Sequence, residues 1–71
     1  MTQAEAIKEA IAILYAMSAQ VAPLEASYVE SWQLYGCETP LQRMTLARMV
    51  EKYLPTNEQL AAEILGQERL V

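Results

Sequence analysis

Residues 10–17 form an uninterrupted run of eight apolar residues in a chain of only 71. We interpret this run as the middle of a helix that spans about Gln3 to Gln20. Only Ala, Glu and Lys lie behind its apolar stripe, so the stripe is wider than that of an ordinary surface helix. A stripe of this width predicts that neighbouring elements cover the first helix on more than one side.

The first helix has a start signal and a defined inward face. Thr2 and Glu5 have the spacing of a capping box, in which each side chain binds the backbone amide of the other residue. The alanines on the opposite side either meet water or form a second packing seam against a helix of this chain or of another. The predicted inward line consists of Ile7, Ile11, Leu14, Ser18 and Val21, and the alanines are Ala12, Ala16 and Ala19.

Proline, glycine and capping residues divide the rest of the chain into three further helices. Pro23 either breaks the first helix near residues 21–22, which we favour, or kinks one continuous rod. Gly36 marks a helix end, and the Thr39-Pro40-Leu41-Gln42 segment marks the next start. The expected helices are Pro23–Tyr35, Pro40 to about Leu54 and Asn57–Leu65, with Gly66 as a terminator and a tail, Gln67–Val71, that frays unless Leu70 and Val71 fold back.

These signals predict a single helical domain over residues 1–71. The fold class is all-α, a small bundle of three to four short helices organised around the first helix. The composition agrees, because 54% of the residues are apolar, only two are glycine, and no segment alternates as a strand would. Cys37 is the only cysteine and there is no histidine, so neither an internal disulfide nor a zinc site is expected to hold the fold together.

The net charge of −4 makes the chain mildly acidic. An acidic balance argues against a protein that grips the phosphate backbone of nucleic acid by bulk electrostatics. The apolar run is too short to cross a bilayer, and the N-terminal segment lacks the basic residues of a signal peptide. Together with the free Cys37, these features predict a cytoplasmic protein that does not span a membrane.

The sequence contains no motif typical of catalysis. It lacks histidine as a general base, a nucleophile elbow and a glycine-rich phosphate loop. Its carboxylates fall at outward helical positions or at helix caps, and Cys37 has no basic neighbour along the chain that would activate it. We therefore expect a protein that is not an enzyme and that has no cofactor, no metal and no small-molecule substrate.

Aromatic residues at helical spacing distinguish the second helix. Tyr28, Trp32 and Tyr35 are expected to share one face with Leu24 and Ser31. This stripe fits a helix core, a protein interface or a stacking platform, and tyrosine and tryptophan are enriched in the first two settings. Leu34, Leu41 and Met44 fit neither helix's own stripe, and this favours the interface.

The predicted partner-binding residues surround the link between the second and third helices. Arg48, with Arg43 and Lys52, is either simply solvated or supplies charge complementarity to a partner. The resulting set of candidate residues is Trp32, Tyr35, Leu41, Met44 and Arg48.

The functional hypothesis is a non-enzymatic protein–protein interaction module. It would act as a small cytoplasmic adaptor or regulator, or as an inhibitor that docks on a larger protein complex, of the kind that phages and mobile elements encode. The partner is another protein or a second copy, and a homodimer is the simplest case. The alternative is a helix-turn-helix transcriptional regulator, formed by residues 46–53 and 57–65. Nucleic acid is the weaker candidate partner, because the second helix of that pair has no Arg or Lys to contact DNA.

Overall fold

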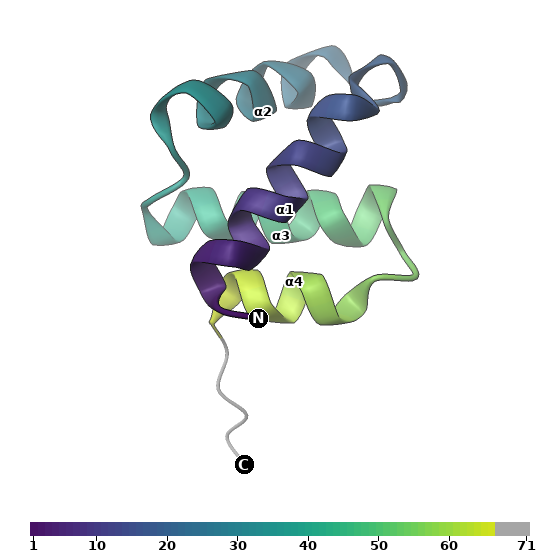
Figure 1. Ribbon diagram of the computed structural model, residues 1–71. Coiled ribbons are helices and arrows are strands. Elements are labelled where there is room, and N and C mark those ends of the chain that lie inside the picture. The colour runs from purple at the N-terminus through teal and green to yellow at the C-terminus, as the bar shows by residue number, and fades with distance from the viewer. Residues whose placement is uncertain (67–71) are drawn as a thin grey trace.

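The computed structural model describes residues 1–66, which form four α-helices joined by short links (Figure 1). No strand is present in this part of the chain, so the predicted all-α bundle is confirmed. The expectation that residues 67–71 fray concerns residues outside the described range. The helices are α1 (Gln3–Ala16), α2 (Pro23–Tyr35), α3 (Pro40–Tyr53) and α4 (Glu58–Leu65), with a 3₁₀ turn at Ser18–Gln20.

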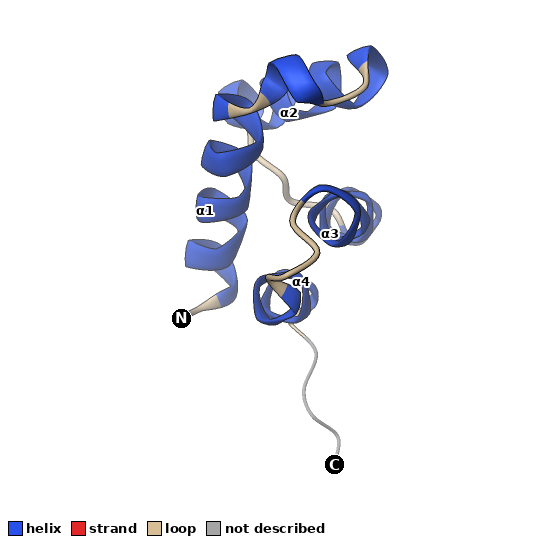
Figure 2. Cartoon of the chain, turned by 90° about the vertical axis from the view of Figure 1, so that its right-hand side faces the viewer, coloured by secondary structure: helices blue, strands red, loops and turns tan. Residues whose placement is uncertain are grey.

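Helix α1 packs against each of the other three helices. Figure 1 shows α1 running diagonally across α3, from α4 towards α2, and Figure 2 shows α3 and α4 on one side of α1, with α2 across its upper end. Helices α3 and α4 form the most extensive pair, whereas α2 packs mainly on α1. The bundle is therefore organised around the first helix, and α2 is held less extensively than α3.

The core consists of apolar side chains from all four helices. Within α1, Ala6 and Ala10 let the facing helices approach closely, and Leu14 fills the space between them. The predicted inward line of α1 is largely correct, since Ile11 and Val21 are buried and Ile7 is half-buried. The largest fully buried side chains are Leu14, Val29, Leu46, Met49, Val50 and Ile64.

Both predicted capping boxes, at Thr2 and at Thr39, are confirmed by hydrogen bonds. The Glu5 amide donates to the Thr2 hydroxyl over 3.1 Å, and the Thr2 amide donates to the Glu5 carboxylate over 2.9 Å. Thr39 and Gln42 make the same reciprocal pair at the start of α3. Asn57 precedes α4, but its side chain makes no capping hydrogen bond.

The first helix ends earlier than the sequence predicts. It stops at Ala16 instead of Gln20, where the chain tightens into a 3₁₀ turn: the Gln20 and Val21 amides donate to the carbonyls of Met17 and Ser18, three residues back. Val21 then adopts an extended conformation and buries its side chain. Pro23 occupies the first turn of α2, so the predicted break between the two helices is confirmed.

The exposed alanines of α1 have no partner helix within residues 1–66. Ala12, Ala16 and Ala19 are all exposed, so in this part of the chain they meet water. None of the helices in the described range combines the length and apolar character that a membrane span requires.

Gly66 closes the described fold by bringing the end of α4 against the start of α1. Its φ of +64° is left-handed, as predicted for a terminating glycine. The Gln3 side-chain amide donates to the Ile64 carbonyl over 2.8 Å. A Cβ at position 66 would lie 2.8 Å from that same Gln3 nitrogen, so a side chain there would displace the Gln3 amide from its bond to Ile64.

Replacement of Leu14 by alanine tests the dependence of the bundle on α1. We expect Leu14→Ala to lower the free energy of unfolding by about 2–5 kcal/mol, because the side chain is fully buried. Domains of this size have about 3–5 kcal/mol in total, so much of the variant should be unfolded in water. Urea denaturation followed by circular dichroism measures the change. Leu34→Ala is the matched control, because Leu34 is 72% exposed, and equal losses in the two variants would contradict the assignment.

Candidate functional site

The structure places four of the five candidate partner-binding residues on the surface. Tyr35 is 79% exposed, Leu41 is 71% exposed, and Met44 and Arg48 are also exposed. They lie at the end of α2 and on the first three turns of α3, around the link at residues 36–39. The sequence therefore identified a set of exposed side chains close to one corner of the bundle.

Trp32 differs from the other candidates, because it is only 6% exposed and belongs to the core. Its ring stacks on Tyr28, with ring centroids 5.9 Å apart and planes inclined by 30°. The part of Trp32 that remains accessible lines hollows on both sides of α2. Trp32 thus supports the surface from beneath and is not a free contact residue in the isolated chain.

The face of α2 that meets the core is not the predicted aromatic stripe. Val29 and Trp32 are its buried residues, and Ala26 packs against them. Leu24, Tyr28, Ser31 and Tyr35 share a helical flank, at positions i, i+4, i+7 and i+11, and all four are exposed. The core-facing side of α2 could have been found from the sequence, because Ala26, Val29 and Trp32 also recur at helical spacing. The large aromatic residues pointed instead to the neighbouring flank.

A groove separates this flank of α2 from α3. It opens into a hollow of about 400 Å³ lined by Tyr28, Ser31 and Trp32 from α2. Leu41, Gln42 and Thr45 line it from α3. The structure thus brings two predicted residues, Trp32 and Leu41, to one hollow, while Tyr28, Ser31, Gln42 and Thr45 were not among the predicted site residues.

The wall that α3 contributes continues beyond the hollow. Leu41, Thr45, Arg48 and Lys52 share one flank of α3, again at positions i, i+4, i+7 and i+11. Met44 is exposed one turn after Leu41. Arg48 therefore lies on the same side of α3 as Leu41 and the groove, as its helical spacing predicts.

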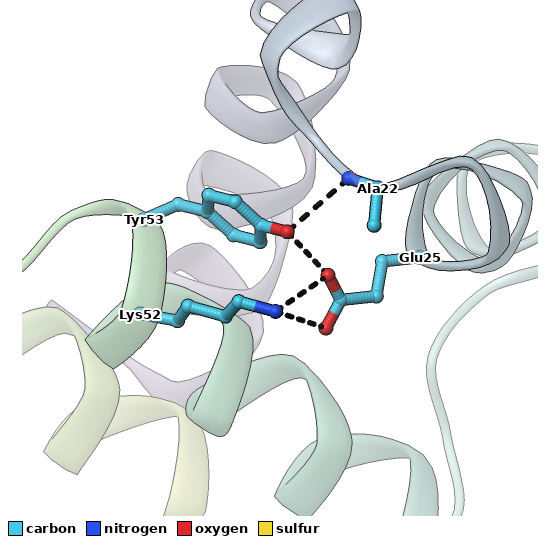
Figure 3. A network of polar contacts seen from close by, with 4 residues as sticks. All are labelled: Ala22, Glu25, Lys52 and Tyr53. Atoms are coloured by element: carbon cyan, nitrogen blue, oxygen red, sulfur yellow. Dashed lines mark hydrogen bonds and ion pairs between the residues drawn. The ribbon is translucent and has the colours of Figure 1, made fainter.

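A polar network bridges α2 and α3 at the end of the groove far from the link (Figure 3). The Tyr53 hydroxyl donates a hydrogen bond to the Glu25 carboxylate and accepts one from the Ala22 amide over 3.2 Å. The Lys52 ammonium lies 3.2 Å from the same Glu25 carboxylate. These contacts tie the start of α2 to the end of α3.

The network also explains the ionisation of Glu25. The hydrogen bond from Tyr53 is the largest effect that holds the pKa of the Glu25 carboxyl below its ordinary value of 4.5. Lys52 lowers this pKa further, against the opposing effect of partial burial. Glu25 also lies in the first turn of α2, where the helix dipole favours a negative charge.

The groove carries a different charge from the rest of the surface. Its two flanks and the hollow contain no carboxylate, and the carboxylate at its end, that of Glu25, is paired with Lys52. Two other hollows of the described chain contain acids: Glu51 and Glu58 line one between α3 and α4, and Glu30 lines one beside Tyr15. A third, between α1 and α2, is lined by Lys8 and has no acid. The α2–α3 groove is therefore apolar, with the cation Arg48 on its rim.

The single thiol lies close to this corner but is enclosed. Cys37 is buried, and burial raises the pKa of its thiol above the ordinary value. The sequence suggested that no basic residue is nearby, which is wrong, because Arg43 opposes this rise through its charge. The effect of burial is the larger one, so the thiol is held in its unreactive form.

The helix pair behind the DNA-binding alternative has the expected layout. Helices α3 and α4 pack together across the turn at residues 54–57. Helix α4 exposes Glu58 and Gln59, and Gln59 donates to Glu63 over 2.9 Å. With no Arg or Lys between Glu58 and Leu65, α4 offers nothing to neutralise phosphate, and the alternative stays a prediction.

Comparison with protein-family models, with curated proteins and with solved structures found no match to this chain. The geometry described above is accordingly the basis for the functional proposal.

Replacement of Tyr53 by phenylalanine tests the network. Loss of the hydroxyl should raise the pKa of Glu25 towards 4.5, as measured by an NMR titration of its side-chain carboxyl carbon. Because the folded-state pKa is depressed, the network stabilises the fold above pH 4.5 and loses its effect as the pH falls through the folded-state value. Tyr53→Phe should therefore cost about 1 kcal/mol near pH 7 and progressively less in acid. Tyr35→Phe is the control, and a Glu25 pKa that moves equally in both variants would refute the assignment.

Proposed function

We propose that this chain is a non-enzymatic protein–protein interaction module that docks on its partner through the α2–α3 surface. One observation carries the proposal: six of the eight large apolar residues that are exposed in the described chain lie on these two helices. The remaining two are Met1 and Tyr15. The six are Leu24, Tyr28, Leu34, Tyr35, Leu41 and Met44.

The chemistry of this surface favours protein as its partner. Contiguous exposed apolar side chains of this kind mark interaction sites on small proteins. Tyrosine supplies a large, rigid contact area together with a polar group, and tyrosine, tryptophan and arginine are enriched at binding hot spots. Tyr35 and Arg48 provide such exposed groups, and the buried Trp32 stiffens the surface below them.

The proposed biological role is a small cytoplasmic adaptor or regulator, or an inhibitor that covers part of a larger complex. A module of this size acts by occupying a surface, because it offers the partner one face and little else. The partner is a different protein or a second copy of this chain. A homodimer would use the same surface on both subunits, and it would appear as a doubled mass in solution.

Aspartate substitutions on two exposed residues test the surface. Met44→Asp should abolish capture of the partner from a lysate of the native host, identified by mass spectrometry, or abolish self-association measured by light scattering. A charge introduced into a desolvated contact should weaken binding by more than about 1.4 kcal/mol, which corresponds to more than about tenfold in affinity. Tyr15→Asp is the matched control, because Tyr15 and Met44 are both 46% exposed and Tyr15 lies on α1.

Both variants must keep the circular dichroism spectrum of the parent protein. Trp32→Ala is unsuitable for this purpose, because removal of a buried side chain tests folding and not docking. Unchanged capture and unchanged mass in Met44→Asp, or equal losses in both variants, would contradict the proposed surface.

A further inference from the structure

We infer that the groove between α2 and α3 receives one amphipathic α-helix of a partner protein, and that this helix presents acidic side chains to the α3 rim. The inference rests on the proposed function and specifies what docks there. It follows from the shape of the groove, from the apolar side chains that line its hollow, and from the distribution of charge around it.

The shape of the groove suits a helix. Helices α2 and α3 are connected at one end by the link at residues 36–39 and bridged at the other by Glu25 and Lys52 (Figure 3). Between these ends α2 packs mainly on α1, and α3 packs on α1 and α4, so the two facing flanks remain open. The hollow between the flanks extends over about one turn of each helix, from Tyr28 to Trp32 and from Leu41 to Thr45, which matches the spacing of apolar anchors on successive turns of a bound helix.

The walls of the hollow favour apolar anchors over a polar ligand. The Thr45 hydroxyl already donates to the Leu41 carbonyl over 2.9 Å. The Gln42 side-chain oxygen is occupied by the backbone amides at the start of α3. Between them the hollow presents Trp32, Tyr28 and Leu41, a surface into which apolar side chains at positions i, i+3 or i+4, and i+7 of a helix would fit.

The charge around the groove selects the flanking residues of the bound helix. Arg48 lies on the rim, and within residues 1–66 the one ion pair is that of Lys52 with Glu25, so Arg48 has no carboxylate partner there. The flanks of the groove carry no acid of their own. A partner helix with Glu or Asp beside its apolar stripe would therefore find complementary charge.

The same distribution disfavours two other occupants. A second copy docking by the same groove would bring each Arg48 against flanks that carry no carboxylate, and the exposed Glu38 lies only in the link at one end, so the contact would have little charge complementarity. Nucleic acid would find one unpaired cation on the rim of a protein with a net charge of −4. Both remain measurable outcomes of the experiment.

The test uses a displayed library of 18-residue helices. Leu, Ile, Met and Phe vary along one stripe of each helix, and Glu, Gln and Lys occur at equal frequency beside the stripe. Selection on the parent protein should enrich Glu over Lys beside the stripe by about two- to fivefold, the ratio expected of an exposed charge pair. Selection on Arg48→Glu should remove or reverse that preference.

Lys8→Glu is the matched control for the charge. Lys8 is an exposed cation beside a different hollow, the one on the far side of Trp32 between α1 and α2. The preference for Glu should survive this substitution. A preference for Glu that is lost in Lys8→Glu, or that is retained in Arg48→Glu, would assign the helix to another surface and overturn the inference.

Trp32 reports binding directly, because it is the only tryptophan and it lines the hollow. Titration with a tryptophan-free peptide chosen from the enriched helices should change the fluorescence of Trp32. Leu41→Asp should weaken the binding of that peptide by at least about tenfold. Failure to enrich any acidic helix overturns the inference. So does a homodimer, or retention on duplex DNA, that depends on Arg48.

The two proposals fail in different ways. If no acidic helix is enriched but Met44→Asp still loses the host partner, the inference is wrong and the docking surface stands. If capture from the host is unaffected by Met44→Asp and the selected helices do not depend on Leu41, the proposed function is wrong as well.

Discussion

The burial of α1 against three helices at once is the interaction on which the rest of the structure depends. The chain has no disulfide to close it, and its core is small, so α2 and α3 must each place apolar surface on α1. Leu14 and the small Ala6 and Ala10 make this possible, because they let helices approach from different directions (Figure 2). One helix cannot cover both sides of its neighbours, so the side of α2 and α3 away from α1 stays open.

The open α2–α3 groove is thus a direct consequence of how the core is built. Helix α2 packs on α1 through Val29 and Trp32, and this orientation turns the flank with Tyr28 and Tyr35 towards α3 without bringing the two helices together. The bridge between Glu25 and the end of α3 holds the far end of the groove. A groove held at both ends can receive a partner with little rearrangement, which lowers the entropic cost of binding.

Charge separates the groove from the remaining surface. The carboxylates of α4 and of the outer side of α2 keep most of the protein acidic, whereas the groove has an apolar lining and the Arg48 side chain on its rim. In the proposed complex, the apolar lining would supply affinity and the rim charge would supply orientation and discrimination among partners. This division of roles suits a small module whose activity consists of occupying one site on another protein.

The sequence by itself determined the elements whose causes are local. The capping boxes at Thr2 and Thr39 and the glycine that ends α4 follow from bonds within one turn of the chain, and they were predicted correctly. The exposure of Leu41 and Met44 was also predictable, because they fall off the apolar stripe of their own helix. The rotation of α2 about its axis was decided only by the tertiary structure. Trp32 and Tyr35 are both large and aromatic, but Trp32 is buried in the core and Tyr35 is exposed. This rotation depends on the direction from which α1 packs on α2, and spacing along one helix carries no information about that direction.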